Sequence, residues 1–241
     1  MEHALSLGYD AAVDNERRRE IMTTDASGGG RRSLKAAIIP VTPFQQNCCL
    51  VWDEESKVGV VVDPGGDLEQ IKAAIKEVGI RVDKILLTHG HIDHAGAAAD
   101  LRDALGVEVI GPHRADEFLL NDLAAQGAKY GIDAKAIIPD RWLNEGDSVD
   151  VAGHTFDVFH CPGHSPGSVV LFDKVQRFAL VGDVLFRGSI GRTDFPYGDH
   201  EALLSAIRTK LLPLGDDVVF ICGHGPTSSF GAERTSNPFL V

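Results

Sequence analysis

The sequence predicts an α/β fold in which two β-rich halves pack face to face and carry their helices on the outside. Short β-rich runs dominate from Ser33 onward, and segments with helical periodicity interrupt them in each half. Apolar residues make up 44% of the 241 residues, which is enough for a sizeable buried core. No tandem repeat is visible, so a repeat architecture is not expected.

The composition limits the kinds of partner that the protein can have. The chain has 35 Asp and Glu against 23 Lys and Arg, which gives a formal net charge of −12 at pH 7. This excess of negative charge argues against binding a nucleic-acid backbone over a broad surface. No apolar run approaches the roughly 20 residues of a membrane-spanning helix. We therefore expect no nucleic acid and no membrane as partner, and a monomer or a small homo-oligomer.

The first 33 residues differ from the rest of the chain. They end in TTDASGGGRRS, a stretch rich in Ser and Gly that cannot hold a fixed backbone without outside contacts. We expect residues 1–33 to form a disordered or flexible tail. Residues 34–241 are then expected to form a single domain.

The cysteines and the first residues indicate the compartment. Four cysteines in a chain of this length do not form a disulfide framework. The beginning of the chain has no long apolar core and contains Glu2, Asp10 and Asp14, which disfavour a secretory signal and an organellar presequence. These features favour a reducing compartment, and we expect the protein to be cytoplasmic.

Strands and helices alternate in the first half of the expected domain. Asp67 can cap a helix in which Leu68, Ile71 and Ile75 recur at helical spacing. The run 82–88, VDKILLT, indicates a strand that is buried on both faces. We expect strands at 36–41, 49–53, 58–63, 82–88 and 107–111, helices at 68–78 and 95–105, and a partly helical stretch at 113–139.

The second half repeats this pattern with fewer helices. Asp199 can cap a helix at 200–212, where Leu203, Ile207 and Leu211 share one face. We expect strands at 148–151, 155–160, 168–172, 178–181 and 218–222. The last of these strands runs directly into a glycine-rich turn.

The strongest chemical signal follows the strand at 82–88. The segment 88–94 reads THGHIDH, and His89, His91, Asp93 and His94 can each bind a divalent metal. Residues two apart do not share a helical face, so we expect a curled loop, which Gly90 eases by removing the crowding of a Cβ. The alternative is a chance cluster of surface histidines, but the end of a buried strand is a defined place in the fold.

Three more candidate ligands stand where apolar strands end in glycine-rich turns. His164 lies in CPGHSPG (161–167), Asp183 in GDV (182–184) and His224 in CGHG (222–225). Each of them alone would more often be an ordinary turn residue. Because α/β folds gather their sites at strand ends, we expect the five histidines and two aspartates to meet at one rim of the sheets.

Seven ligands are too many for one four-coordinate zinc ion, and they divide well between two metals. We assign His89, His91 and His164 to the first metal and Asp93, His94 and His224 to the second. Asp183 bridges them, because a carboxylate has two oxygens whereas imidazole offers one lone pair. Two divalent metals about 3.5–4 Å apart can share a water and lower its pKa to about 7, which gives hydroxide at neutral pH.

The charges of such a site favour hydrolysis. Two divalent cations outweigh two aspartates and a hydroxide, so the pocket would attract an anionic substrate and stabilise a developing oxyanion. Cys161 and Cys222 lie next to candidate ligands in the sequence, so thiolate ligation is an alternative. The histidines already fill the required positions.

The motifs THGHIDH, CPGHSPG, GDVLF and CGHG, in this order, resemble those of the metallo-β-lactamase fold superfamily. Within it, residues 35–241 look like the short bacterial-type glyoxalase II proteins, which are hydroxyacylglutathione hydrolase-like thioesterases. VDPGG at 62–66, GRTDFP at 191–196 and ER-x-x-NPF at 233–239 extend the resemblance over nearly the whole expected domain. The resemblance implies a four-layer αβ/βα sandwich of two mixed sheets with helices outside, and the ligand roles assigned above.

The resemblance also implies roles around the metals. Asp63 matches a position that supports the metal site, although a plain turn residue before Pro64 is an equal alternative. Arg192 matches a basic residue that contacts the glutathione part of the substrate. Two residues further along, the family usually has a tyrosine, whereas this chain has Asp194. The sequence ends 17 residues after His224, before the C-terminal helical region of full-length enzymes. We therefore expect a thioester hydrolase without strict specificity for lactoylglutathione.

These observations predict a metal-dependent hydrolase that cleaves small anionic thioesters by a metal-bound hydroxide. The first candidate substrates are S-acylglutathione compounds such as S-lactoylglutathione. Asp93 and Asp183 are the candidate catalytic residues, and the cofactors are two divalent ions, zinc first, with iron or manganese as alternatives. GRTDF also resembles the persulfide dioxygenases of the same superfamily, which use one iron held by two His and one Asp. A mononuclear iron oxidoreductase is therefore the alternative function, ranked second because GHGP at 223–226 resembles the hydrolases.

Overall fold

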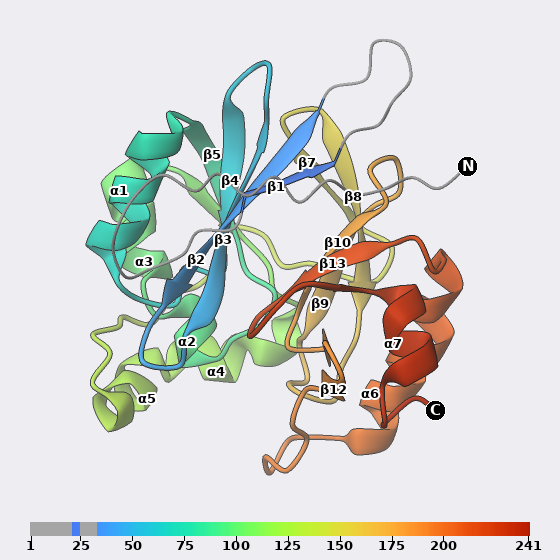
Figure 1. The fold of residues 1–241 in the computed structure, drawn as a ribbon. Helices are drawn as coiled ribbons and strands as arrows, with labels where there is room; N and C mark the ends of the chain where they lie inside the picture. Colours follow the sequence, from blue (N-terminus) through green and yellow to red (C-terminus); the bar gives the residue numbers. More distant parts are fainter. Residues whose placement is uncertain (1–20, 25–32) are drawn as a thin grey trace.

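In the computed structural model, which describes residues 21–24 and 33–241, two six-stranded β-sheets face each other (Figure 1). The first sheet, in the order β1-β2-β3-β4-β5-β6, consists of β1 (Ile21–Thr24), β2 (Leu34–Val41), β3 (Gln46–Asp53), β4 (Val58–Val62), β5 (Arg81–Leu86) and β6 (Glu108–Ile110). The second, in the order β14-β13-β10-β9-β8-β7, consists of β7 (Ser148–Val151), β8 (His154–His160), β9 (Val169–Asp173), β10 (Phe178–Gly182), β13 (Val219–Cys222) and β14 (Ser228–Ser229). The pairs β4–β5, β5–β6 and β10–β13 are parallel and the others antiparallel, so both sheets are mixed.

Helices cover the outer faces of the two sheets. Figure 1 shows α1 (Leu68–Val78) and α3 (Ala98–Leu105) beside the first sheet, and α6 (His200–Ala206) and α7 (Phe230–Ser236) beside the second. The remaining helical elements are α2 (Ile92–Ala95), η1 (Arg114–Asp116), α4 (Glu117–Asn121), α5 (Leu123–Tyr130), η2 (Ile207–Leu211) and η3 (Leu212–Leu214). A short hairpin of β11 (Leu185–Phe186) and β12 (Ser189–Ile190) stands apart from the sheets. The predicted four-layer αβ/βα sandwich is confirmed.

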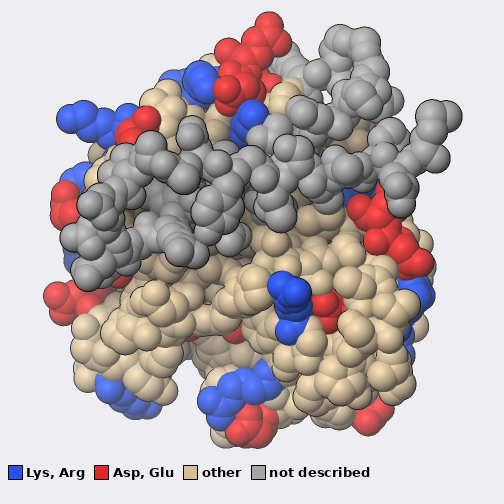
Figure 2. All heavy atoms as spheres, in the orientation of Figure 1, with Lys and Arg blue, Asp and Glu red and all other residues tan. Residues whose placement is uncertain are grey.

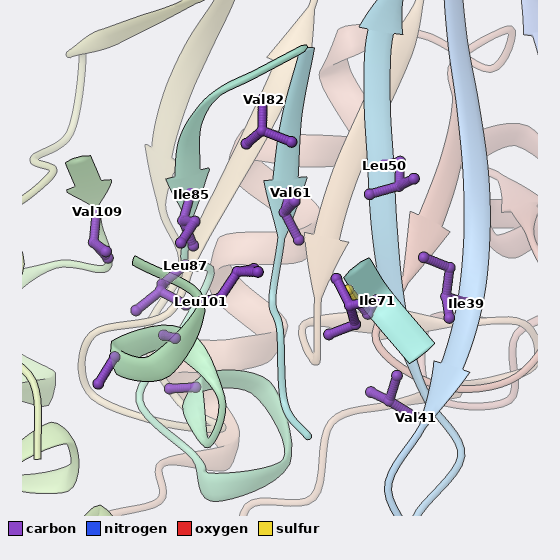
Figure 3. Packing of buried hydrophobic residues seen from close by; sticks show 14 of the residues in the cluster. Ile39, Val41, Leu50, Val61, Ile71, Val82, Ile85, Leu87, Leu101 and Val109 are labelled. Atoms are coloured by element: carbon purple, nitrogen blue, oxygen red, sulfur yellow. The ribbon is translucent and has the colours of Figure 1, made fainter. Parts of the chain in front are cut away.

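Buried side chains form a cluster between each pair of neighbouring layers. In Figure 3, Ile71 of α1 and Leu101 of α3 belong to the cluster that also holds Val61 and Ile85 of the first sheet. A second cluster joins the facing sides of the two sheets, and a third joins the second sheet to α6 and α7. Ile85 belongs to the first cluster and Leu86 to the second, so the carboxyl end of β5 is buried on both faces as predicted.

The two predicted helix caps have different outcomes. The Asp199 carboxylate accepts a hydrogen bond from the Ala202 amide at 2.9 Å and caps α6, as expected. Asp67 precedes α1 but makes no side-chain cap; its carboxylate accepts a hydrogen bond from the Thr42 amide at 2.9 Å. The prediction for Asp67 is therefore wrong, because a tertiary contact with the turn after β2 uses the group that a local cap would need. The predicted helix 200–212 begins as α6 and continues as the wider turn η2 and the tighter turn η3.

Within the stretch 1–33, the structure describes β1, which pairs antiparallel with β2 in the register Ile21 to Ala37 and Thr24 to Leu34. Ile and Thr favour extended backbone, which agrees with a strand at this place. The expectation of a flexible tail does not apply to these four residues. Residues 1–20 and 25–32, to which it also refers, lie outside the described residues.

The surface and the cysteines add two findings. Basic and acidic side chains are interspersed on the face shown in Figure 2. Among the described residues, no helix has the length and apolar character that crossing a membrane requires. All four cysteines are buried and none forms a disulfide.

Candidate metal centre

The seven candidate ligands follow the carboxyl ends of four strands. The segment 89–94 leaves β5 and runs into α2, His164 follows β8, Asp183 follows β10 directly, and His224 follows β13. In Figure 1, α2 and the β11–β12 hairpin lie at the lower end of the sheets, and the surface in Figure 2 is hollowed at its lower edge. The strand ends therefore bring the predicted residues together, as the topology of α/β folds favours.

The first predicted group consists of three imidazoles around one point. The Nδ1 atom of His91 lies 3.0 Å from Nε2 of His89 and 3.0 Å from Nε2 of His164. A ring nitrogen carries one hydrogen or one lone pair, so the three nitrogens cannot all satisfy one another by hydrogen bonds. All three side chains are buried, and their nitrogens lie within reach of a common cation.

The second predicted group lies beside the first. Oδ2 of Asp93 is 3.1 Å from Nε2 of His224 and 3.9 Å from Nε2 of His94. His94 is fully buried, whereas Asp93 and His224 are partly exposed. These three residues form a set whose ligand atoms lie within 4.8 Å of one another.

Asp183 stands between the two groups. Its Oδ2 atom is 3.5 Å from Nε2 of His164 and 3.5 Å from Nε2 of His224, while Oδ1 is 3.3 Å from Nε2 of His94. The carboxylate thus contacts one group through His164 and the other through His94 and His224. This is the position that the sequence assigns to a bridging ligand.

Two buried atoms at the centre of the site have no hydrogen-bond partner. They are Nε2 of His94 and Oδ1 of Asp183, which lie close together without forming a hydrogen bond. Leaving such atoms unpaired in the interior is unfavourable by about 1–3 kcal/mol each. A cation bound between them would satisfy both, so the donor set fits a divalent metal.

Each of the five imidazoles has its other ring nitrogen held by a partner outside the cluster. The partners are the Thr88 hydroxyl for His89 (3.2 Å), the Tyr197 hydroxyl for His91 (2.8 Å), the Asp63 carboxylate for His94 (2.9 Å), the Arg192 carbonyl for His164 (2.9 Å) and the Phe44 carbonyl for His224 (3.2 Å). Carbonyl and carboxylate oxygens only accept, so Nδ1 carries the hydrogen in His94, His164 and His224. In the neutral form of these rings the Nε2 lone pairs therefore face the cluster, as metal ligation requires. Burial opposes protonation, but the nearby carboxylates, Asp183 above all for His94, raise the pKa of His94 and of His224, so a metal that binds them must displace a proton.

Asp63 orients two of these rings at once. Its Oδ1 accepts a hydrogen bond from the Thr88 amide at 2.7 Å, and its Oδ2 accepts one from the Thr88 hydroxyl at 2.6 Å and contacts Nδ1 of His94. Because the Thr88 hydroxyl gives its hydrogen to Asp63, its oxygen accepts from Nδ1 of His89. Of the two roles open in the sequence, the supporting role is therefore the one that the contacts of Asp63 match.

Burial sets the protonation of the first group. It lowers the pKa of His89 well below its usual value, lowers that of His91 to about 3, and also lowers that of His164. Neutral imidazole is the form that binds metals. Burial opposes ionisation of Asp183, but His94 and the neighbouring histidines outweigh it and lower the pKa of this carboxyl. The group then stays a carboxylate.

The thiols do not take part in the cluster. Burial raises the pKa of Cys161 and of Cys222 to about 12, so both remain protonated at neutral pH. The Cys222 thiol donates to the His224 carbonyl oxygen at 3.0 Å. Neither belongs to a candidate ligand group among the described residues, and the alternative of thiolate ligation gains no support.

Arg192 lies at the rim of the site. Its backbone carbonyl holds His164, but its exposed side chain pairs with Asp194 and stacks over the Phe195 ring. The guanidinium does not enter the cluster. The sequence-based role of Arg192 in substrate binding remains a prediction.

Two residues that contribute to the site were not predicted from the sequence. The buried Asp116 carboxylate accepts hydrogen bonds from the Gly90 amide (2.8 Å), the Ser165 hydroxyl (2.7 Å) and the Gly167 amide (2.6 Å), so it joins the two histidine loops. Tyr197, whose hydroxyl holds His91, is the other. Tyr197 follows the GRTDFP motif directly, which was the available signal, whereas the segment around Asp116 carries no motif.

Comparison with known proteins agrees with this geometry. The sequence model described as the Metallo-beta-lactamase superfamily matches residues 41–224, a range that contains all seven candidate ligands. Hydroxyacylglutathione hydrolase GloC of Haemophilus influenzae is 49% identical over 209 residues, which cover 86% of this chain and 98% of that protein.

Two solved structures are similar to this one over nearly their whole length. The BLEG-1 B3 metallo-beta-lactamase has a TM-score of 0.79 and 38% identity, covering 85% of this chain and 99% of its own. TTHA1623 in a di-iron-bound form has a TM-score of 0.76 and 37% identity, covering 84% of this chain and 99% of its own. The sequence match includes the strand ends that carry the candidate ligands, and on the grounds of this match and of the identity to GloC the chain belongs to the metallo-beta-lactamase superfamily.

Proposed function

We propose that this protein is a metal-dependent hydrolase of thioesters, with S-acylglutathione such as S-lactoylglutathione as its substrate class. The observation that carries the proposal is the position of Asp183 between two groups of three ligand atoms. The 49% identity to a protein named hydroxyacylglutathione hydrolase supports the choice of substrate.

The cofactors that we propose are two divalent ions. The first ion would be held by His89, His91 and His164. The second ion would be held by Asp93, His94 and His224. Asp183 would be a ligand of both ions. Zinc is the first choice because imidazole and carboxylate suit it, with iron or manganese as alternatives; the similar TTHA1623 is described in a di-iron-bound form. When bound, such ions lower the pKa of a shared water to about 7 and polarise a carbonyl oxygen.

The protein itself positions and activates the attacking water through its carboxylates. Burial opposes ionisation of Asp93, but His94 and His224 outweigh it and lower the pKa of this group, so it stays a carboxylate at neutral pH. A carboxylate oxygen of Asp93 then accepts a hydrogen bond from the water. This hydrogen bond directs a lone pair of the water oxygen at the carbonyl carbon of the thioester. Asp183 keeps the two ligand groups at a fixed separation.

The leaving group also fits a site of this composition. The thiol of a cysteine-like compound has a pKa of about 8.5, so its thiolate leaves without a general acid from the protein. A site whose candidate ligands are carboxylates and imidazoles, with no residue assigned as general acid, meets this requirement. The cytoplasmic location and the monomeric or small oligomeric state stay predictions of the sequence.

Replacing Asp183 by Ala tests the proposal. The wild-type protein is expected to bind close to two metal ions per chain and to hydrolyse S-lactoylglutathione. The Asp183→Ala variant should lose most of its metal and at least about 100-fold in kcat/KM, because both groups lose a ligand. Metal analysis and thiol release measure the two effects, with the exposed Asp217→Ala as control. Full metal content and normal turnover in Asp183→Ala would refute the assignment.

The same purified protein also distinguishes the proposed hydrolase from the alternative function, a persulfide dioxygenase. A persulfide dioxygenase would hold one iron per chain and consume oxygen with glutathione persulfide. If the purified protein shows this behaviour and does not release thiol from S-lactoylglutathione, the hydrolase proposal fails. The GHGP segment at 223–226 and the 49% identity to hydroxyacylglutathione hydrolase GloC are our reasons for expecting hydrolysis.

A further inference from the structure

Arg192 at the rim of the metal centre is already engaged by a carboxylate of its own chain. Its Nε donates to Oδ1 of Asp194 at 2.7 Å and its Nη2 to Oδ2 at 2.8 Å, which is a bidentate pair. Each group moves the pKa of the other: that of Arg192 is raised and that of Asp194 is lowered, with the hydrogen bonds between them as the main cause. Both side chains therefore carry full and opposite charges that cancel at this point.

The ring of Phe195 separates the pair from the first group of ligands. The Arg192 guanidinium stands 4.4 Å from the centre of the Phe195 ring, and this ring lies 5.0 Å from that of His91 and 5.7 Å from that of His164. The Arg192 carbonyl also accepts from Nδ1 of His164. The ion pair is therefore a charged feature of the rim beside the first group.

We propose that Asp194 sets the substrate preference of the site by neutralising Arg192. The proposal rests on the proposed thioester hydrolysis and concerns which thiol part the site accepts. The backbone holds the Asp194 carboxylate next to the Arg192 guanidinium, which gives this carboxylate a high effective concentration. A carboxylate of the substrate must therefore compete with Asp194 for the guanidinium. The site should therefore gain little from negative charge on the thiol part of the thioester.

Exposed aromatic side chains also lie near the ligands. Tyr197 stacks on Phe195 with 5.3 Å between ring centres and contacts Phe118, which is 47% exposed. On the side of the second group, Phe44 contacts Tyr130 at 5.1 Å, and both rings are exposed. Exposed aromatic rings of this kind bind uncharged, partly apolar groups well. The substrate class is thus thioesters in which a carboxylate on the thiol part is not required.

Two substrates with the same acyl group test this inference. S-lactoylglutathione has carboxylates on its thiol part, whereas S-lactoyl-N-acetylcysteamine has none. In Asp194→Asn the free guanidinium should raise the ratio of kcat/KM for the first substrate over the second by about 2- to 5-fold, through KM, and more at low salt. Removing both partners, Arg192→Ala with Asp194→Ala, should leave the ratio within about twofold of the wild type, because a neutral pair is lost.

A matched control exists elsewhere in the chain. Arg177 donates to both oxygens of Asp217 at 2.8 and 2.7 Å, the same geometry at an exposed place away from the ligands. Asp217→Asn should therefore leave the substrate ratio unchanged. An unchanged ratio in Asp194→Asn would overturn the inference, and so would a loss of tenfold or more when both partners are removed, since Arg192 would then be binding substrate in the wild type.

Binding measurements separate this inference from the proposed function. If no variant hydrolyses either thioester, the proposed function fails. Calorimetric titration with S-methylglutathione still tests Asp194 in that case, because it requires no turnover. Asp194→Asn should bind this probe about 2- to 5-fold more tightly than the wild type, and equal dissociation constants would contradict the role of Asp194.

Discussion

The position of single hydrogen atoms on the imidazoles decides whether the cluster can bind metal. In their neutral forms His94, His164 and His224 present Nε2 lone pairs, because carbonyl or carboxylate oxygens accept the hydrogens on Nδ1. His91 is turned the other way, with Nδ1 inward and Nε2 on the Tyr197 hydroxyl. The ligand set therefore depends on a surrounding layer of acceptors as much as on the ligands themselves.

Gly223 is required beside this cluster for a steric reason. A Cβ at this position would lie 2.0 Å from Oδ1 of Asp183 and 2.5 Å from Cε1 of His94. Gly223→Ala is therefore expected to displace both ligands, so that metal content falls well below that of the wild type and kcat/KM drops at least about tenfold. Metal analysis of the purified variant measures the effect.

Gly225→Ala is the control for this substitution. Gly225 has a φ of 76° and nothing within 4 Å of an added Cβ, so Ala should lower the free energy of unfolding by about 1 kcal/mol without loss of metal. Two bound metals and normal turnover in Gly223→Ala would show that the ligands tolerate the added methyl group.

The sequence was sufficient for residues whose chemistry is local. His89, His91, Asp93 and His94 stand within six residues at the end of a strand, so side-chain type and position alone indicate a metal site. Asp116 contributes through hydrogen bonds to two loops that are 26 and 49–51 residues away in the chain. No local pattern encodes such contacts, and this is why Asp116 was not predicted.

The C-terminal helix α7 supports the rim of the site through the β11–β12 hairpin. The buried Glu233 accepts hydrogen bonds from the Gly188 amide at 2.7 Å, from Nδ2 of Asn237 at 2.9 Å, and from the Ser228 hydroxyl. Nδ2 of Asn237 in turn donates to the Ser189 carbonyl at 2.9 Å. The hairpin leads directly into residues 191–198, so the ER-x-x-NPF motif has a structural role in positioning this segment.

Glu233→Ala tests the role of α7. The substitution leaves the Gly188 amide and the Ser228 hydroxyl without this acceptor, and should lower the free energy of unfolding by about 2–4 kcal/mol. Urea unfolding measures the total effect. Hydrogen exchange should accelerate more at residues 186–190 than in the two large sheets, which shows where the support is lost.

The exposed Glu55→Ala is the matched control for Glu233→Ala. It should change the free energy of unfolding by less than about 0.5 kcal/mol and leave exchange at 186–190 unaltered. Equal exchange at 186–190 in the wild type and Glu233→Ala would contradict the anchoring role.

The helix boundaries show what local signals can and cannot predict. The helix at 68–78 and the strand at 148–151 agree with the structure at both ends, because apolar spacing and turn residues define them. The helix α7 and the strand β14 were not predicted, since their seven and two residues carry little periodicity. Their formation depends on Phe230, which is fully buried against the second sheet.

At the level of the whole molecule, a buried histidine connects the two sheets. His154 is the first residue of β8, and its Nε2 atom lies 3.4 Å from Oδ2 of Asp53. Asp53 is the last residue of β3 in the facing sheet. The Nδ1 atom of His154 lies 3.5 Å from Oδ2 of Asp173, at the end of β9. The contact with the Asp173 carboxylate, opposed by burial and aided by Asp53, raises the pKa of His154. The protonated ring thus stabilises the contact between sheets.

This arrangement makes stability depend on pH in a defined direction. The pKa of His154 is higher in the folded state than its unfolded value of about 6.5, so the stabilisation is complete below that value and is lost as pH rises through the folded pKa. His154→Gln should therefore lower the free energy of unfolding by about 1–3 kcal/mol at pH 6 and by less at higher pH.

Urea unfolding of wild type and His154→Gln from pH 6 to 9, at one metal loading, measures the difference. The exposed His200→Gln is the control and should stay within about 0.5 kcal/mol of the wild type throughout. A difference between His154→Gln and the wild type that grows with pH would show that the ring acts in its neutral form.

The architecture of four layers could be predicted because strand and helix patterns recur in both halves. That residues 34–241 form a single domain stays a prediction, which the cluster shared by both sheets and the family match over 41–224 support. The pairing of β1 with β2 could not be predicted, because Ile21–Thr24 is too short to distinguish from its surroundings.

The origin of the ligands has a consequence for how the protein matures. Each group of three takes two residues from the segment after β5 and one from the second half, His164 or His224, so neither half contains a complete set. If the two groups hold metal as proposed, it can bind tightly only after both halves have folded and met, and the bound metal is then a reversible cross-link between them. Unfolding is then linked to the concentration of free metal: for each metal site, a tenfold rise above the dissociation constant adds about 1.4 kcal/mol to stability. The availability of metal, besides controlling activity, would thus decide how long the folded chain persists.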